Sequence, residues 1–222
     1  RLFNSLNLTM TLVSSGGFLP SDNLSEIIET NFQKIVLSFS LIISLLNFFF
    51  LFNIFKKNTF YKNHKEDFYL LILCLVFILL IYFNNFDGFN IVIGVLSSLS
   101  NSGLTLIKDD MNLGLYFLFL TIIGGSVVSN TSGIKLSRFY ILLKITSSEI
   151  IKLISPNSII NKTILLSDNK ITDENIKISF LIFISFFISL FILSSFLVFD
   201  EIGFEKSFKL AIVTLTNTVN SE

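Results

Sequence analysis

Residues 89–104, FNIVIGVLSSLSNSGL, combine an apolar stretch with a turn of small polar residues. As an α-helix, residues 89–100 would be about 18 Å long, whereas the hydrocarbon core of a bilayer is about 30 Å thick. The backbone around such a short helix cannot face lipid, because its N–H and C=O groups would lack hydrogen-bond partners. The stretch therefore predicts a half-helix that enters the membrane, followed by an extended segment that returns to the same side.

The composition of the whole chain is typical of a membrane protein. Of its 222 residues, 52% are hydrophobic and 14% are charged, whereas about 25% of the residues of a soluble domain are charged. The predicted fold class is therefore an all-α polytopic membrane protein. We expect about four full spans, at residues 34–55, 68–83 with their flanks, 112–128 and 178–199.

The charged residues exclude some functions and set the orientation. The 16 basic and 16 acidic residues balance, so we expect no nucleic-acid partner. One histidine, His64, and one cysteine, Cys74, cannot make a Cys/His metal cluster. Residues 56–66 and 135–177 hold 11 of the 16 Lys and Arg side chains, which places both segments on the cytoplasmic side by the positive-inside rule.

The half-helix at residues 89–100 has counterparts near both ends of the chain. Residues 2–13 and 205–216 are also apolar, also too short to cross a membrane, and also followed by small polar residues. This pattern predicts a repeated unit of span, half-helix, polar turn and span, as in transport paths built by pseudo-symmetry. The turns are centred 86 and 116 residues apart, on Gly17, Gly103 and Val219.

Each turn has the residue types expected of a strand that lines a cation pathway. Rings of backbone carbonyls replace the water shell of a cation in a narrow pore, and glycine allows the φ > 0 that aims successive carbonyls inward. The half-helix before the turn points the negative end of its dipole at the cation. Ordinary Gly/Ser loop chemistry is the alternative interpretation. The predicted filter residues are Ser14, Ser15, Gly16, Gly17, Asn101, Ser102, Gly103, Asn217, Thr218 and Val219.

A second run of small residues interrupts the apolar stretch that begins near residue 112. Glycine and β-hydroxyl residues weaken a helix and compete for its backbone hydrogen bonds. We interpret the run as a flexible gate below the filter, and a packing kink made by small residues is the alternative. The predicted gating residues are Gly124, Gly125, Ser126, Ser129, Asn130, Thr131, Ser132, Gly133 and Lys135.

These motifs, in this order, resemble the Trk/Ktr/HKT superfamily of potassium transporters, and most closely the bacterial TrkH-type membrane subunit. That family has four membrane–pore-loop–membrane repeats, each with a glycine-centred filter strand. The stretch SNTSGIK at Ser129–Lys135 resembles the GSTAGGIK stretch of its intramembrane gating loop. Val219 stands where the fourth filter strand would carry glycine, and Asn130 and Ser132 stand where the gating loop carries Thr and Gly. Further similar stretches are SSGGF (14–18), SNSGL (100–104), TNTVN (216–220), NFFFLFNIFKK (47–57), KEDFYLLIL (65–73) and ISPNSIINK (154–162).

The resemblance implies how the chain is organised and what it does. It implies a potassium-channel-like fold and K⁺ uptake through a central pore, with K⁺ bound at the filter residues and no other cofactor. It also implies a homodimer in the bacterial inner membrane, in contact with lipid and with a cytoplasmic nucleotide-binding regulatory subunit of the TrkA type. We expect a fragment of a longer protein that holds a partial second repeat (1–55), a cytoplasmic loop (56–66), the third repeat (67–143), a second cytoplasmic loop (144–172) and a truncated fourth repeat (173–222).

Two alternatives stay open from the sequence. A transporter of another monovalent cation, Na⁺ or ammonium, would use the same architecture. A membrane-embedded transferase would use the turns as active-site loops, but it needs clustered Asp, Glu or His at the membrane surface, and the acidic residues here are scattered. We therefore predict a transport protein rather than an enzyme.

Overall fold

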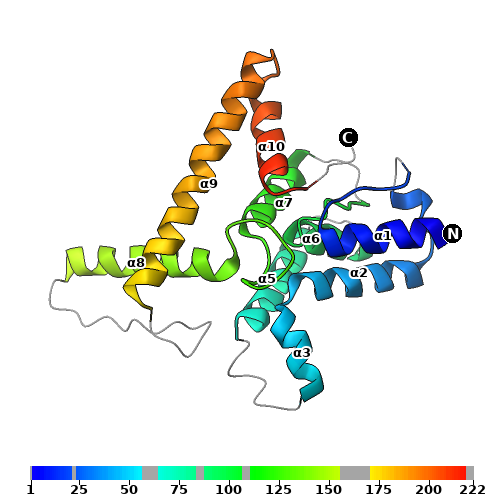
Figure 1. Ribbon diagram of the computed structural model, residues 1–222, viewed down its shortest axis with the longest axis horizontal. Coiled ribbons are helices and arrows are strands. Elements are labelled where there is room, and N and C mark those ends of the chain that lie inside the picture. Colours follow the sequence, from blue (N-terminus) through cyan, green and yellow to red (C-terminus); the bar gives the residue numbers. More distant parts are fainter. Residues whose placement is uncertain are drawn as a thin grey trace.

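The computed structural model describes residues 2–21, 24–56, 65–83, 88–106, 111–155 and 171–218. Within these ranges every regular element is a helix, and the helices are joined by turns and loops (Figure 1). The predicted all-α fold class is therefore confirmed for the described part of the chain. The three predicted half-helices form, as α1 (Leu2–Ser14), α6 (Gly88–Leu99) and α10 (Phe204–Leu215).

The first half-helix is followed by a longer helix that lies beside it. After α1 and a 3₁₀ turn, η1 (Leu24–Glu26), the chain enters α2 (Asn31–Leu45), which packs against α1. A capping box starts α2: Gln33 N–H donates to Thr30 Oγ1 over 3.4 Å, and Thr30 N–H donates to Gln33 Oε1 over 3.1 Å. These bonds satisfy backbone donors that the first turn of a helix leaves without partners.

The expected continuous span at residues 34–55 is wrong. The helix ends at Leu45, and a second helix, α3 (Phe48–Lys56), begins after two residues. Asn47 explains the restart, because its Oδ1 accepts the N–H of Phe49 over 2.9 Å, as an N-cap residue does. The N–H of Asn47 is itself bound by Asp67 Oδ1 over 2.8 Å. A buried carboxylate from a distant part of the sequence thus stabilises the break.

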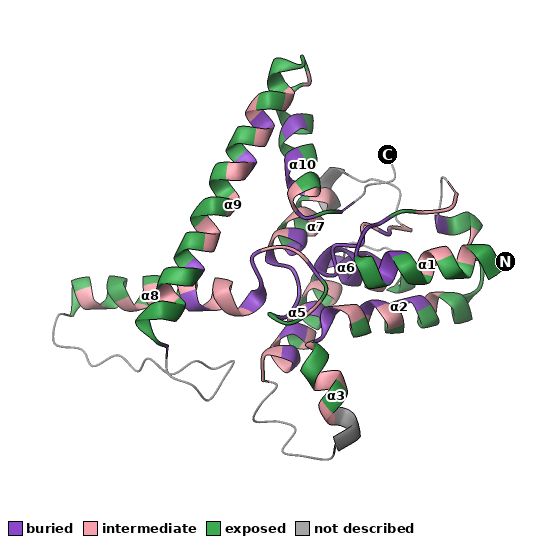
Figure 2. Cartoon of the chain, viewed as in Figure 1, coloured by how far each residue is buried: buried purple, intermediate pink, exposed green. Residues whose placement is uncertain are grey.

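The second half-helix, α6, lies at the centre of the core. It packs against α2, α5 (Lys65–Tyr82) and α7 (Met111–Ile123). Every residue from Ile93 to Leu99 is buried, and Figure 2 shows this part of the chain among the most buried. A helix that ends inside a membrane exposes backbone groups that must find partners within the protein. The helices around α6 surround it with protein on several sides and so meet this requirement.

The expected helix at residues 112–128 is shorter than predicted, and the following segment is more helical. The helix α7 ends at Ile123, residues 124–135 form a loop, and α8 (Leu136–Ile154) follows. Residues 144–154, the first part of the segment expected as a cytoplasmic loop, are helical, and residues 156–170 lie outside the described residues. The cytoplasmic location of 144–172 stays a prediction. Ile145 packs beside Ile141 and Ile171, so the contact with the start of the next helix stabilises this part of α8.

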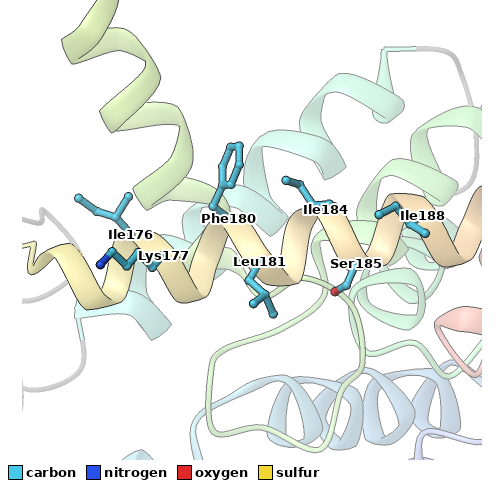
Figure 3. Close-up of a pocket in the computed structure, with 7 residues that line it drawn as sticks. All are labelled: Ile176, Lys177, Phe180, Leu181, Ile184, Ser185 and Ile188. Atoms are coloured by element: carbon cyan, nitrogen blue, oxygen red, sulfur yellow. The ribbon is translucent and has the colours of Figure 1, made fainter.

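The last two helices form a hairpin at one end of the molecule (Figure 1). Of the described helices, only α9 (Asp173–Phe199) is long and apolar enough to cross a membrane by itself. Its side chains are mostly exposed, so its apolar surface is the kind that faces lipid or other helices. An open pocket along α9 (Figure 3) is part of this apolar helix surface, lined by Ile176, Lys177, Phe180, Leu181, Ile184, Ser185 and Ile188.

Candidate functional site

The three half-helices end in the same backbone turn. A left-handed residue follows one position after the end of α1 and two positions after the ends of α6 and α10. These residues are Ser15, Asn101 and Asn217, with φ of 51°, 57° and 53°. In each case the next residue donates its N–H to the carbonyl five positions earlier, the 6→1 hydrogen bond of a Schellman motif. These bonds are Gly16 to Thr11 (3.2 Å), Ser102 to Ser97 (3.1 Å) and Thr218 to Val213 (2.9 Å). The predicted internal repeat is thus matched by repeated local geometry.

The predicted glycines take the backbone conformation for which glycine is needed. Gly17 has φ of 68° and Gly103 has φ of 67°, each two positions after the left-handed residue that ends the half-helix. This alternation turns the backbone out of the helix and into an extended strand. The equivalent position of the last turn, Val219, lies outside the described residues.

Side-chain hydroxyls tie two of the turns together in the same way. Ser100 and Ser102 hydroxyls lie 2.9 Å apart, and Thr216 and Thr218 hydroxyls, at the equivalent positions, lie 3.0 Å apart. The first turn has Ser14 and Gly16 at these positions, and there Thr11 Oγ1 donates to Phe18 O over 2.5 Å instead. In the second and third turns the hydroxyls of Ser102 and Thr218 also reach back to the half-helix carbonyls of Ser97 and Val213. In all three turns, hydroxyl groups thus fix the conformation near the end of the half-helix.

Two of the left-handed residues carry a buried oxygen that makes no hydrogen bond within the described residues. These atoms are Oγ of Ser15 and Oδ1 of Asn101. Asn101 uses its other amide atom, because Nδ2 donates to Thr121 O over 2.9 Å and so ties its turn to the end of α7. Buried polar atoms are normally satisfied, so these two oxygens are available to accept a bond from a ligand or a water molecule.

Residues 124–135, here called the intramembrane loop, fold back on the end of α7 at the centre of the molecule (Figure 1). The N–H groups of Ile134 and Lys135 donate to the carbonyls of Ile122 and Ile123 over 2.9 and 2.8 Å. The returning end of the loop thus satisfies carbonyls that the last turn of a helix leaves without partners. The predicted interruption at the small residues is correct, and it is an ordered turn of the backbone rather than a kink in a continuous helix.

Glycine is required at two positions where the loop backbone passes close to itself. Gly124 has φ of 70°, and a Cβ there would lie 2.2 Å from Ser132 O. Gly133 has φ of 85°, and a Cβ there would lie 2.8 Å from Ile122 O. Any other residue would combine backbone strain with a steric clash at these sites.

The intramembrane loop contacts the turns that end the first and the last half-helix. Asn130 Nδ2 donates to the carbonyl of Val13 over 3.1 Å, near the end of α1. Ser132 Oγ donates to the carbonyl of Thr216, directly after α10. The predicted gating residues are therefore in direct contact with the segments that hold the predicted filter residues, although they are far apart in the sequence.

The loop also fills the break between α2 and α3. Ser126 N–H donates to Leu45 O over 3.2 Å, and Phe48 N–H donates to Val128 O over 2.9 Å. Glu66 at the start of α5 accepts the N–H of Val127 over 3.2 Å. Sequence reasoning missed this role of Glu66 and also the role of its neighbour Asp67, because a pair of carboxylates at the start of a helix is common. The available signal was the acidic pair itself, placed where an apolar stretch begins.

Comparison with known proteins agrees with this geometry. No family model matches the chain. The crystal structure of the potassium transporter TrkH from Vibrio parahaemolyticus superposes with a TM-score of 0.84 over 98% of this chain, at 20% sequence identity. The chain has the TrkH fold. An uncharacterized cation transporter of Methanocaldococcus jannaschii is 25% identical over 214 residues, which are 91% of this chain.

The likeness to TrkH supports the coarse interpretation of the sequence. The resemblance to TrkH-type membrane subunits is confirmed at the level of the fold, and both similar proteins are transporters by name. The chain spans 50% of the TrkH chain and 42% of the archaeal transporter. Within the described residues, no group of three or more His, Cys, Asp or Glu side chains is placed to hold a metal ion.

Proposed function

We propose that the protein is the pore-forming subunit of a Trk-type uptake system and conducts K⁺ across the cytoplasmic membrane of a bacterium. The observation that carries the proposal is the pair of matched turns at residues 15–17 and 101–103. In both, a half-helix ends in a left-handed residue and a glycine with positive φ follows two positions later. Repetition of this geometry is what a ring of backbone carbonyls requires.

The ion in this proposal is held by oxygen atoms of the filter strands. Backbone carbonyls supply most ligands, and hydroxyl pairs such as Ser100–Ser102 and Thr216–Thr218 keep the strands in place. The half-helices point their C-terminal ends at the turns, which favours a cation by the helix dipole. Val219 is part of the fourth strand, and the Cβ of Val219 would disfavour the positive φ that glycine adopts there.

The intramembrane loop is the gate in this proposal. It contacts the last turn of α1 and the turn after α10 through Asn130 and Ser132, and it contacts the α2–α3 break through its own backbone. A loop tied by single hydrogen bonds to several elements can be released by a modest movement of any one of them. Its glycines and hydroxyls therefore serve a change of conformation as well as a fixed turn.

The proposal extends to the assembly. By analogy with TrkH-type subunits, the protein forms a homodimer with one pore in each subunit, and a cytoplasmic TrkA-type nucleotide-binding subunit regulates it. The proposed units are residues 1–55, 67–143 and 173–222, separated by cytoplasmic segments at 56–66 and 144–172. Support comes from the TrkH fold and from the basic residues gathered in both cytoplasmic segments.

The direct test is ion uptake in cells that lack their own potassium uptake. The protein, expressed from its complete gene, is expected to restore growth at low external K⁺ and to admit a rubidium tracer. Gly103→Arg should abolish both, because a long charged side chain at φ of 67° disrupts the strand. Gly203→Arg is the matched control, since Gly203 is exposed and has open space where a Cβ would lie.

The outcomes separate the alternatives. Uptake of Rb⁺ that Gly103→Arg removes and Gly203→Arg retains supports a potassium pathway through these turns. Uptake of Na⁺ or ammonium instead would support a pore whose selectivity differs from that for K⁺. Val219→Gly would then be the next variant to measure. No cation flux despite normal amounts of protein in the membrane would contradict the pore and favour the transferase alternative.

A further inference from the structure

Lys135 is the one lysine whose side chain folds back into the intramembrane loop among the described residues. It immediately precedes α8, and it is only 8% exposed. Its backbone has φ of 77° and ψ of 136°, a conformation that residues with a Cβ rarely adopt. Such strain persists only where the surroundings hold the residue in place. The backbone N–H bond to Ile123 O is one such anchor, and the side chain supplies another.

The side-chain anchor is a group of four neutral oxygen atoms from two loop residues. The ammonium nitrogen of Lys135 donates to the carbonyl of Thr131, and it lies 2.9 Å from Thr131 Oγ1. It lies 3.4 Å from Ser129 O and 3.3 Å from Ser129 Oγ. The two hydroxyls are themselves 2.8 Å apart. Carbonyl and hydroxyl oxygens around one positive charge are the ligand type that a monovalent cation takes in a filter.

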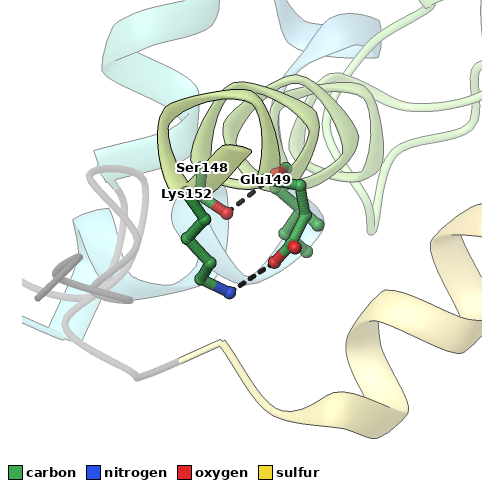
Figure 4. Close-up of polar contacts among 4 residues, drawn as sticks. Ser148, Glu149 and Lys152 are labelled. Atoms are coloured by element: carbon green, nitrogen blue, oxygen red, sulfur yellow. Dashed lines mark hydrogen bonds and ion pairs between the residues drawn. The ribbon is translucent and has the colours of Figure 1, made fainter. Parts of the chain in front are cut away.

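Lys152, a lysine near the end of α8, shows a different arrangement. Lys152 Nζ pairs with the carboxylate of Glu149 over 2.5 Å, and both side chains are about half exposed (Figure 4). An exposed pair of this kind contributes little to stability. The Lys135 ammonium is instead buried and takes neutral oxygens, so its desolvation must be offset by those charge-assisted hydrogen bonds.

We propose that the Lys135 ammonium is a tethered cation that folds the intramembrane loop into its closed form. It gathers the oxygens of Ser129 and Thr131 around one charge. Residues 130 and 132, which flank Thr131, are those that contact the last turn of α1 and the turn after α10. The ammonium thus acts as a positioning group for both contacts. The inference rests on the proposed function of the loop as a gate.

The inference predicts a cavity that can be refilled. Lys135→Ala removes three methylenes and the ammonium, and n-propylammonium supplies those same atoms. The purified full-length protein is placed in vesicles, and flux of a thallium or rubidium tracer is measured. Without the tethered charge, basal flux should rise roughly tenfold. This is the change in the open population expected when the closed form loses one charge-assisted hydrogen bond. Millimolar n-propylammonium should return the flux towards that of the unaltered protein.

Three controls make the test specific. Tetramethylammonium carries the same charge without N–H donors, so it should not lower the flux of Lys135→Ala. Lys135→Met fills the same volume without a charge, so it should raise the flux as Lys135→Ala does but resist n-propylammonium. Lys152→Ala removes an equal charge near the end of α8 and should behave as the unaltered protein.

A second measurement keeps the inference separate from the proposed function. Thermal unfolding of the purified variants is followed with and without n-propylammonium, and it needs no transport. We expect n-propylammonium to raise the Tm of Lys135→Ala but not that of Lys135→Met. This result would support the tethered cation even if the unaltered protein conducts no ions. The inference would be overturned if Lys135→Ala had the same flux and the same Tm as Lys152→Ala. If the unaltered protein conducts normally in that case, the proposed pore would still stand.

Discussion

Two interruptions of helices contact each other inside this molecule, and they have different causes. Between α2 and α3 the helix stops for two residues, Leu46 and Asn47, within an apolar stretch that contains no glycine. Between α7 and α8 it stops for the whole intramembrane loop, which is rich in glycine, serine and threonine. The loop bonds to the backbone on both sides of the shorter break.

The comparison teaches that a helix can be interrupted from within or from outside. The residues of the loop favour a break by themselves, because glycine and β-hydroxyl residues are poor helix formers. The shorter break depends on partners: Leu45 O and Phe48 N–H find theirs in the loop, and Asn47 N–H finds its partner in Asp67. Substitutions in the two regions should therefore differ in how much they destabilise the fold.

The largest effect is expected for a side chain added at Gly124. In Gly124→Ala the Cβ would lie 2.2 Å from Ser132 O at a φ of 70°, and strain and overpacking together should destabilise the fold by about 3 kcal/mol. Thermal unfolding of the purified protein measures this loss. Gly114→Ala is the matched control within α7, since nothing lies within 4 Å of its Cβ position. An unchanged Tm for Gly124→Ala would mean that the loop is not packed as described.

The next effect is expected at Asp67, which is 1% exposed. Asp67→Ala removes the acceptor of the Asn47 N–H, and a buried donor left without a partner costs about 1–3 kcal/mol. Asp67→Asn keeps an acceptor oxygen and should cost less. Unfolding measurements on both variants test whether the shorter break depends on this carboxylate, and equal losses for Ala and Asn would argue against it.

A smaller effect is expected where the intramembrane loop contacts the two turns. Ser132→Ala and Asn130→Ala each remove one donor to a carbonyl at a half-helix end, at a cost of about 1 kcal/mol each. Basal ion flux in vesicles should rise with each variant, since the loop is less firmly held in its closed form. The double variant should depart from the sum of both free-energy changes, because Asn130 and Ser132 flank Thr131 in one loop and the two bonds are therefore coupled.

The smallest effect is expected at Asn47 itself. Asn47→Ala removes the side-chain oxygen that accepts the N–H of Phe49, and loss of an N-cap typically costs about 1 kcal/mol or less. The backbone N–H of Asn47 can still bind Asp67. We therefore expect a lower Tm than in the unaltered protein but no change in ion flux, and a change in flux would show that this break also contributes to gating.

Much of the fold was predictable from local patterns. Short apolar stretches before Gly17 and Gly103 predicted half-helices, and the small residues from Gly124 to Gly133 predicted an interrupted helix. Both predictions succeed because they depend on local properties. One is the length of an apolar stretch relative to the thickness of a membrane, and the other is the conformational freedom of glycine. The left-handed conformations of Ser15, Asn101 and Asn217 were missed, since serine and asparagine adopt many turn conformations with similar ease.

Two of the errors involve segments whose structure depends on distant partners. The span predicted at residues 34–55 is broken because Asp67 and the intramembrane loop satisfy its backbone. The loop predicted to begin at residue 144 is helical to Ile154 because Ile141 and Ile145 pack against Ile171. Neither partner can be read from the segment itself.

The sequence by itself determined that this is an all-helical membrane protein with repeated half-helices and glycine turns, because these features follow from apolar length, charge and backbone freedom. Only the tertiary structure decided where the intramembrane loop lies and what it binds. Its contacts with Val13, Thr216 and Leu45 join residues more than 80 positions apart. Such contacts form because backbone groups inside a membrane must find partners within the protein, and no local pattern specifies which partner is near.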